Sequence, residues 1–463
     1  MKNLKITAPL DPAFEPIYLG LCEFQARAEE LGGPVIRIAL ERNDGLTAVH
    51  DLRILPEGAD DALNIRMAER MVKSMLWVYG GFRVTIAGSK TVYEGVKAQY
   101  CEGGAREFDF RFMARVYEHA FEVLYAENIA DAPEKKNAAA PLGRHLKGCR
   151  IGFDAGGSDR KVSAVIDGES VYSEEVVWFP KTNSDPHYHY EGIVEAMKTA
   201  AAKMPRVDAI GVSSAGIYIN NRTMSASLFL KVGEEDYEKY VKDIYIRAAK
   251  EIGDVPLVVC NDGDVTALAG AMSLNEDGIL GIAMGTSEAG GYVDMDGNIT
   301  GWLNELAFVP CDLAAAAMED EWSGDIGCGV KYFSQDAVIK LAPAAGIELD
   351  PALSPAEKLK IVQGKMLEGH EGAQKIYETI GVYLGYTLAF YAMFYDINHV
   401  LLMGRVTSGK GGDLVLAKAQ EVRKAEYPEL KMQVNLPDEK SRRVGQSAPA
   451  ASLPEAGAVP LHP

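Results

Sequence analysis

The chain is 463 residues long, with 48% hydrophobic and 24% charged residues. These proportions are typical of a soluble globular protein, and the length predicts two or three domains. The formal net charge of −19 argues against nonspecific binding to nucleic acids or acidic membranes, because such binding requires a basic surface. An anionic nucleotide is still compatible with this charge, since a bound Mg²⁺ makes a site locally positive.

The cysteines and the first residues predict a cytoplasmic protein. The six cysteines are scattered without a CxxC pair, which indicates reduced thiols rather than a disulfide framework. The N-terminal stretch lacks the apolar core of a secretory signal. Residues 380–395 are uncharged and apolar, but they include two glycines and are fewer than the about 20 residues of a membrane span. We therefore predict a buried helix there and no membrane partner.

Residues 1–145 are predicted to form a separate α+β accessory domain. Alternating and helical periodicity predicts strands at 35–40, 48–55 and 82–87 and helices at 64–79 and 108–125. The sequence Asn43-Asp44-Gly45 is a strong hairpin signal between the first two strands. No residue pattern in this region indicates a particular chemistry, and residues 131–143 have the composition of a linker.

A glycine turn follows the first strand after this linker. Asp154 ends an apolar strand at 151–153, Ala155-Gly156-Gly157-Ser158 form the turn, and residues 161–167 return as a strand. Glycines let the backbone approach a ligand closely, so that its N–H groups can bind phosphate oxygens. A neighbouring carboxylate can hold hydrated Mg²⁺. The alternative is an ordinary hairpin whose glycines serve only the turn.

Strands then alternate with helices, which predicts a largely parallel sheet. A strand at 209–213 runs into Ser214, a long helix is predicted at 235–252, and a strand at 256–260 runs into Asn261 and Asp262. Ligands of such sheets bind beyond the carboxyl ends of the strands, where Asp154, Ser214 and Asp262 all fall. The alternative for Asp262 is a helix N-cap without catalytic work, although Asp264 could be the cap instead.

The pattern restarts after residue 278. A strand at 278–284 leads into Gly285-Thr286-Ser287, which has the composition of a second phosphate-binding turn or of a plain turn. Glu305 is the only acid between Asp296 and Asp312, and its alternative is a solvated loop acid. Further on, Ser354-Pro355-Ala356-Glu357 forms a capping box that opens a helix. The helix at 371–395 is followed by a strand at 400–403 that ends at Gly404.

Together these segments resemble sugar kinases of the ROK family, over roughly the last two-thirds of the chain. The similar motifs are DAGGS at 154–158, NDGD at 261–264, GTSEAGG at 285–291, Asn304-Glu305 and the helix–strand–glycine segment at 384–404. The family belongs to the superfamily of actin and hexokinase. The resemblance implies an α/β fold of two ribonuclease-H-like domains around a cleft. The implied domains are 146–265, completed by 440–463, and 266–439.

The resemblance also implies ATP and Mg²⁺ as cofactors and a small sugar as substrate. Asp262 would be the catalytic base, and Asp154 would hold Mg²⁺ through water. The implied nucleotide and phosphate ligands are Gly156, Gly157, Ser158, Gly285, Thr286, Ser287, Gly404 and Arg405. The implied sugar ligands are Asn261, Asn304 and Glu305, to which the sheet-edge argument adds Ser214.

Three departures from the family pattern bear on function. Glu305 is followed by Leu306-Ala307-Phe308 instead of the family's Gly-His and cysteine cluster, so we predict no zinc site. Ser287-Glu288 replaces a glycine and an apolar residue, and an anion there would repel phosphates unless it points away or meets the metal. Gly404 is followed by Arg405 instead of a second glycine. His187 and His189, which have no further ligand nearby in the sequence, are predicted to be polar surface residues.

The function predicted from these residues is an ATP-dependent sugar kinase. The alternative is a nucleotide-binding protein of the same fold with lost or altered catalysis, whose N-terminal domain is regulatory or binds a partner. A phosphotransferase or ATPase acting on a non-sugar is a third reading. The resemblance leaves a homodimer open, and the N-terminal region lacks the winged helix of ROK repressors, so no nucleic-acid partner is predicted.

Overall fold

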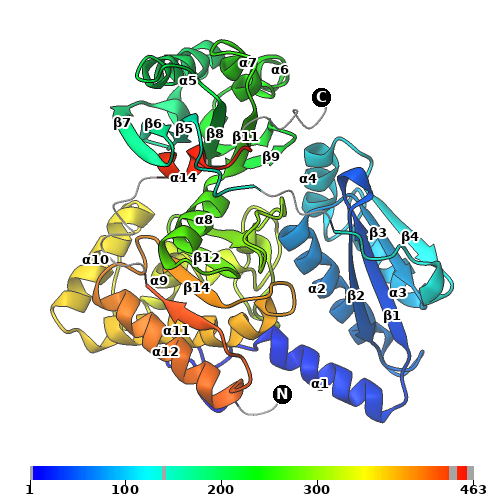
Figure 1. Ribbon diagram of the computed structural model, residues 1–463. Helices are drawn as coiled ribbons and strands as arrows, with labels where there is room; N and C mark the ends of the chain where they lie inside the picture. The colour runs from blue at the N-terminus through cyan, green and yellow to red at the C-terminus, as the bar shows by residue number, and fades with distance from the viewer. Residues whose placement is uncertain (1–3, 138–141, 437–445, 456–463) are drawn as a thin grey trace. The chain divides into compact units, whose positions relative to one another are not determined.

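The computed structural model describes residues 4–137, 142–436 and 446–455. The chain divides into two compact units, which are taken separately here (Figure 1). Unit 1 comprises Met1–Ala138, Ile282–Gly290 and Trp302–Leu436. Unit 2 comprises Ala139–Gly281, Gly291–Gly301 and Pro437–Pro463. The N-terminal residues thus share a unit with most of the second half of the chain. The three-domain division drawn from the sequence stays a prediction.

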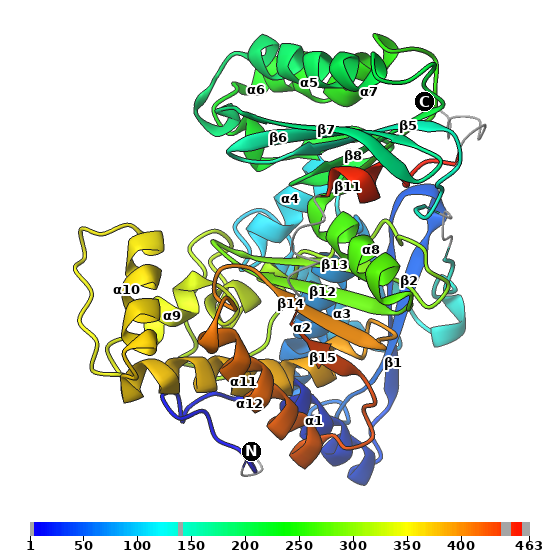
Figure 2. The same ribbon diagram turned by 60° about the vertical axis from the view of Figure 1, so that its left-hand side comes forward.

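Unit 2 is built on a five-stranded sheet of order β11-β8-β5-β6-β7. Its strands are β5 (Cys149–Ala155), β6 (Asp159–Ile166), β7 (Glu169–Val177), β8 (Ala209–Ser214) and β11 (Leu257–Asn261). Strands β5, β8 and β11 run parallel, whereas β5, β6 and β7 form antiparallel hairpins. Helices α5 (Pro186–Ala201) and α7 (Ile244–Lys250) cover one face, and α14 (Ser447–Ala451) lies on the other (Figure 2).

The C-terminal helix α14 packs directly on the two central strands of this sheet. Gly152 of β5 and Gly211 of β8 are paired in register. A Cβ atom at Gly152 would overlap the carbonyl oxygen of Ser447, and one at Gly211 would overlap that of Ala450. Glycine is therefore required at both positions for the backbone of α14 to approach the sheet. The last described segment of the chain therefore covers one face of the sheet of unit 2.

Unit 2 also contains two further strands and two further helices among its described residues. They are β9 (Ile217–Ile219), β10 (Arg222–Ser225), α6 (Glu234–Asp236) and α8 (Asp262–Leu274). The continuous helix predicted at 235–252 is wrong, because a π-helical turn at Tyr237–Val241 separates α6 from α7. The carbonyl of Lys242 accepts a hydrogen bond from the amide of Thr223 in β10, which removes it from a regular helical ladder. Hydrophobic periodicity alone does not report such a competing partner.

Unit 1 contains two sheets. The N-terminal sheet has the order β2-β1-β3-β4 and consists of β1 (Val35–Glu41), β2 (Thr47–Arg53), β3 (Arg83–Ala87) and β4 (Glu122–Ala126). Its hairpin turns at Asn43–Gly45, as predicted. The second sheet has the order β13-β12-β14-β15, with β12 (Ile279–Met284), β13 (Glu288–Val293), β14 (His399–Met403) and β15 (Gln433–Asn435). The boundary between the two units falls within β12 and β13.

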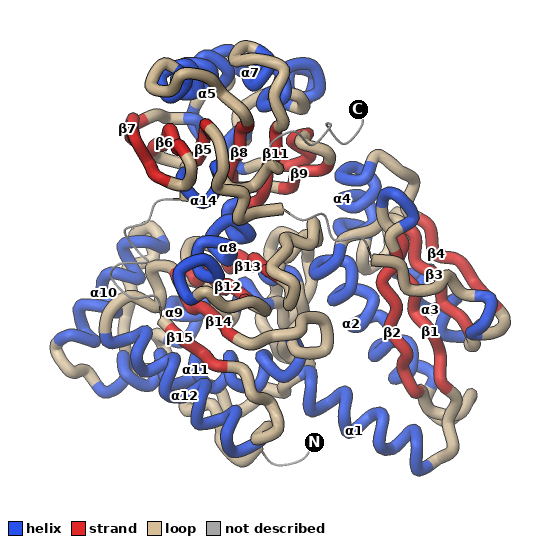
Figure 3. Tube along the Cα trace, in the orientation of Figure 1, coloured by secondary structure: helices blue, strands red, loops and turns tan. Residues whose placement is uncertain are grey.

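Helices make up much of the rest of unit 1 (Figure 3). In the N-terminal part they are α1 (Ile17–Glu30), α2 (Asp61–Tyr79), α3 (Lys90–Gln99) and α4 (Glu107–Tyr117). In the C-terminal part they are α9 (Gln335–Leu341), α10 (Pro355–Leu367), α11 (Glu371–Tyr391) and α12 (Lys410–Glu426). The predicted capping box is present at the start of α10. Helix α11 is buried along most of its length, as predicted, and no helix among the described residues has both the length and the apolar character to cross a membrane.

Candidate active site

The acids predicted to act in catalysis lie at one edge of the sheet of unit 2. In the parallel ladder Asp154 pairs with Ser213, and Ser213 pairs with Cys260, the residue two before Asp262. Because the three strands run parallel, their carboxyl ends lie side by side. The placement of Asp154 and Asp262 at the same edge is therefore a consequence of the strand order.

Burial raises the pKa of both carboxyl groups at this edge. Burial, followed by the charge of Asp262, raises the pKa of Asp154 to about 6. Burial also raises the pKa of Asp262, against the hydrogen bond from the Gly263 amide and the charge of Lys181, which lower it. Two half-buried carboxylates with little compensating positive charge favour a bound cation or proton. Carboxylate oxygens are also the ligands that Mg²⁺ prefers, so this pair fits the metal that the resemblance implies.

Asn261, and neither of the aspartates, is the N-cap of helix α8. Its Oδ1 accepts a hydrogen bond from the Gly263 amide at 2.7 Å, and its Nδ2 donates to the Gly216 carbonyl at 2.8 Å. Asp264 accepts a bond from the amide of Tyr292. The alternative of Asp262 as a mere cap is therefore wrong. Asn261 makes internal bonds at both ends of its amide, and its role as a sugar ligand stays a prediction.

The glycine turn after β5 is fixed from outside by Trp178. The Trp178 indole donates to the carbonyl of Gly156 at 2.7 Å, and its backbone amide donates to that of Ser158 at 3.1 Å. A Cβ atom at Gly157 would lie 2.8 Å from Cε and 3.0 Å from Nζ of Lys181. Lys181 is thus a cation beside both the turn and Asp262. The sequence analysis missed it because it sits in a short 3₁₀ turn without a motif.

Ser214 occupies a more internal position than predicted for a ligand-binding residue. Its side chain is fully buried, and its hydroxyl oxygen accepts hydrogen bonds from the hydroxyls of Tyr218 at 2.7 Å and Tyr245 at 2.9 Å. These tyrosines pack against the core below the sheet edge. The contact of Ser214 with a substrate stays a prediction.

The second glycine turn belongs to unit 1 and is joined there to the segment after β14. The Gly285 amide donates to the carbonyl of Ser287, and the guanidinium of Arg405 donates to the hydroxyl of Thr286 at 2.8 Å. Gly404 has a φ of 95°, and a Cβ atom there would overlap the carbonyl of Met284. The residues of the second predicted phosphate turn and those predicted to bind the adenosine are therefore neighbours within this unit.

Glu288 points away from this turn and into the core of unit 1. Its side chain is buried, and its Oε1 accepts a hydrogen bond from the hydroxyl of Tyr391 at 3.1 Å. Burial raises the pKa of Glu288 to about 8, so the carboxyl group is largely protonated at neutral pH. Among the described residues its Oε2 has no hydrogen-bond partner. The repulsion between this acid and a bound phosphate, considered from the sequence, is removed by this orientation.

Backbone hydrogen bonds and the hydroxyl of Tyr395 contact the Asn304-Glu305 segment. Asn304 has a φ of 52°, and its Oδ1 accepts a hydrogen bond from the Tyr395 hydroxyl at 2.9 Å. The amides of Asn304 and Glu305 donate to the carbonyls of Val78 and Trp77, at 3.0 Å and 2.9 Å. These acceptors belong to the N-terminal part of the chain, which carried no functional signal in the sequence.

The predicted site residues are therefore distributed over both units. Unit 2 brings together Asp154, Gly156, Gly157, Ser158, Ser214, Asn261 and Asp262. Unit 1 holds Gly285, Thr286, Ser287, Asn304, Glu305, Gly404 and Arg405. No group of three or more potential metal ligands occurs within the described ranges. His189 is buried rather than a surface residue, with both ring nitrogens within bonding distance of the carbonyls of Asp185 and Pro180.

No family model and no curated protein sequence matches this chain. Solved structures do match. A ROK hexokinase from Thermus thermophilus is 18% identical, with a TM-score of 0.51, over 66% of this chain and 97% of the hexokinase. A ROK family transcriptional regulator, a homologue of the E. coli MLC protein, is 17% identical, with a TM-score of 0.51, over 66% of this chain and 78% of the regulator.

These similarities confirm the predicted fold class and the fold implied by the sequence resemblance. The identities are low, and one of the two proteins is a regulator, so the fold alone leaves the activity undecided. The chain has an α/β fold of the ROK type.

Proposed function

We propose that this protein is an ATP-dependent sugar kinase, which transfers the γ-phosphoryl group of ATP to a sugar hydroxyl. The observation that carries the proposal is the half-buried carboxyl pair of Asp154 and Asp262 at the strand ends of unit 2. Perturbed carboxyl groups at such an edge are typical of sites that bind a metal or move a proton. The ROK-type fold and the two glycine turns support the same conclusion.

Asp262 is the proposed general base. A sugar hydroxyl is a weak nucleophile at neutral pH and needs a carboxylate within hydrogen-bond reach. Burial raises the pKa of Asp262, which makes its ionised form a better proton acceptor. As the proton moves to Asp262, the sugar oxygen bonds to the γ-phosphorus. The bond between that phosphorus and the β–γ bridging oxygen then breaks, and ADP leaves.

Asp154 is the proposed Mg²⁺ residue and acts through water. When bound, Mg²⁺ neutralises charge on the phosphates. For Asp154 the metal competes with a proton, because burial and Asp262 hold its pKa at about 6. The affinity for Mg²⁺ is therefore expected to fall as the pH drops below about 6. Lys181 supplies further positive charge beside Asp262 and the first glycine turn.

The other roles follow from the sequence and are proposed in the same terms. The phosphates and the adenosine contact Gly156, Gly157, Ser158, Gly285, Thr286, Ser287, Gly404 and Arg405. The sugar contacts Ser214, Asn261, Asn304 and Glu305. We further propose domain limits of 1–145, 146–265 with 440–463, and 266–439, a cytoplasmic location, and no nucleic-acid or membrane partner.

A second candidate is a nucleotide-binding protein of this fold without kinase activity. The specific observations that favour it are the ROK regulator among the similar structures and the internal bonding of Asn261 and Ser214. In that case nucleotide binding would change the conformation of the chain instead of leading to transfer.

A panel of sugars distinguishes the two candidates. The protein is incubated with MgATP and a set of hexoses and amino sugars, ADP release is followed, and sugar phosphate is identified by mass. The kinase proposal expects one sugar class to release ADP stoichiometrically with its phosphate. In parallel, thermal unfolding is recorded with MgATP, with each sugar and with both. Stabilisation by nucleotide alone, with no sugar phosphate formed, would establish the second candidate.

A further inference from the structure

The C-terminal end of helix α2 is bonded to the segment that carries Glu305. The last carbonyls of a helix have no partner within the helix and must find one elsewhere. The Leu76 carbonyl accepts from the Gly80 amide, the Trp77 carbonyl from Glu305, and the Val78 carbonyl from Asn304. Two of these orphan acceptors are therefore satisfied by the proposed sugar-binding residues themselves.

The contact between the C-terminal end of α2 and residues 302–308 is called the junction below. Aromatic packing strengthens this junction on both sides of Glu305. The Trp77 ring is fully buried and lies 4.2 Å from the ring of Phe308, measured between centroids. The ring of Tyr79 meets Trp302 edge-on at 4.6 Å. Helix α2 thus contacts the chain just before and just after the Asn304-Glu305 pair, so the backbone of the pair has little freedom to move.

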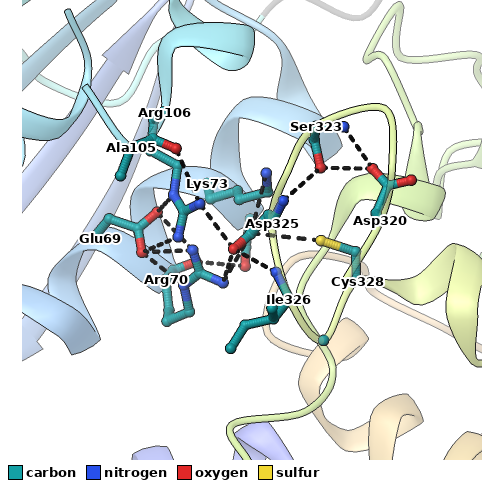
Figure 4. Close-up of polar contacts among 12 residues, drawn as sticks. Glu69, Arg70, Lys73, Ala105, Arg106, Asp320, Ser323, Asp325, Ile326 and Cys328 are labelled. Atoms are coloured by element: carbon teal, nitrogen blue, oxygen red, sulfur yellow. Dashed lines mark hydrogen bonds and ion pairs between the residues drawn. The ribbon is translucent and has the colours of Figure 1, made fainter. Parts of the chain in front are cut away.

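Nearer the middle of the helix, α2 is held to the loop at 320–328 by buried ion pairs (Figure 4). The carboxylate of Asp325 lies 2.9 Å from Arg70, 3.2 Å from Lys73 and 2.8 Å from Arg106. Lys73 also pairs at 3.1 Å with Asp109, which in turn accepts a hydrogen bond from the Trp77 indole. A helix held by charges in its middle presents its C-terminal carbonyls in a fixed place.

We propose that helix α2 is a positioning element for the sugar-binding segment at 302–305, so that the N-terminal part of the chain is an integral part of the substrate site. The role rests on the proposed kinase function. Trp77, Val78 and Tyr395 are positioning residues, because they act on Asn304 and Glu305 and not on the substrate. Loss of this support is expected to weaken sugar binding and to leave ATP binding unchanged.

Hydrogen exchange tests the junction without requiring activity. In the full-length protein the amides of Asn304 and Glu305 should exchange slowly, and Trp77→Leu should speed exchange of the peptide at 302–308 by about tenfold. Phe121→Leu is the matched control, because Phe121 packs on Tyr100 and Phe110 instead. That control should change the same peptide less than about twofold. Rapid exchange of these amides in the unmodified protein, or equal rates in both variants, would overturn the proposal.

A milder variant covers the case in which Trp77→Leu does not fold. Tyr395→Phe removes the hydrogen bond to Asn304 and keeps the aromatic ring. It should raise the KM for the sugar about five- to tenfold, with kcat and the KM for ATP within about twofold. Tyr377→Phe is the control, since that hydroxyl has no hydrogen-bond partner among the described residues. An unchanged sugar KM in Tyr395→Phe would contradict the positioning role and leave the proposed kinase activity intact.

Absence of turnover in every protein, with slow exchange at 302–308, would count against the proposed kinase activity. It would still support the contact between α2 and residues 302–308.

Discussion

Two groups of acids, one buried and one half-buried, occupy opposite electrostatic situations in this protein. In unit 1 the carboxylate of Asp325 is surrounded by Arg70, Lys73 and Arg106, and their charges hold its pKa well below its usual range against the effect of burial. In unit 2 Asp154 and Asp262 lie near each other, and the pKa of each is raised. The negative charge of Asp325 is neutralised by the cationic side chains around it, so this group is structural. The second is left with a charge that a metal, a proton or a substrate can satisfy.

The largest expected effect comes from removing the central acid of the structural group. Asp325→Asn leaves three cations without their shared carboxylate, and we expect the free energy of unfolding to fall by about 3–5 kcal/mol. Chemical denaturation measures it. The control is Asp51→Asn, which breaks the more exposed pair with Arg37 and should cost less than about 1 kcal/mol. A loss of similar size in the two variants would remove the contrast on which the comparison depends.

For Asp262 in unit 2, we expect substitution to lower the activity and not the stability. Asp262→Asn should lower sugar-kinase turnover at least about 100-fold, because the general base is lost. Its stability should be unchanged or increased, because the pKa of Asp262 is raised by folding and the amide carries no charge to bury. Steady-state kinetics and denaturation of the same preparation measure both quantities. The control, Asp243→Asn, removes a solvent-exposed acid that pairs with Arg222, and it should keep full turnover. Full turnover in Asp262→Asn would refute the assignment of the base.

Glu288 is a third kind of acid, because it is buried and has no cation beside it among the described contacts. Gly329 packs against its carboxyl group and provides a test of that packing. A Cβ atom at Gly329 would overlap Oε2 of Glu288 and lie 2.6 Å from the carbonyl of Leu306. Gly329→Ala should therefore cost about 1–3 kcal/mol. Gly364 in helix α10 has no described neighbour within 4 Å of such an atom, so Gly364→Ala should stabilise by about 0.5–1 kcal/mol. Thermal and chemical unfolding compare the two, and equal shifts would show that Glu288 is not packed as described.

Glu288 also contributes a dependence of the free energy of unfolding on pH. Its pKa rises from an ordinary 4.5 to about 8 in the folded protein, so between these values the folded state holds a proton that the unfolded state has lost. Stability from this group is therefore full below about pH 4.5 and falls as the pH rises toward 8, by at most about 1.4 kcal/mol per pH unit. In Glu288→Gln that slope should be absent. Denaturation at several pH values measures the difference between the two proteins, and parallel curves would mean that the carboxyl group is ionised in the folded state.

Local sequence patterns predicted a large part of the architecture. The hairpin at Asn43–Gly45, the capping box of α10 and the buried helix α11 each depend on residues close together in the chain. The common edge of Asp154 and Asp262 also follows from sequence, because alternating strands and helices dictate parallel strands with their carboxyl ends together. Periodicity did not predict the break between α6 and α7, where the carbonyl of Lys242 bonds to a distant strand. It also placed the start of β4 (Glu122–Ala126) in the helix predicted at 108–125, which ends at Tyr117.

The sequence by itself determined the strands β5, β8 and β11, their direction and the acids and glycines at their ends, since these follow from neighbours a few residues away. Only the tertiary structure decided which charges face those acids and what holds Glu305. Lys181 lies beside Asp262, although 81 positions separate them in the chain. Trp77 lies beside Glu305, although 228 positions separate them. Such contacts are fixed by packing of whole elements, and no local pattern of hydrophobicity or propensity encodes them.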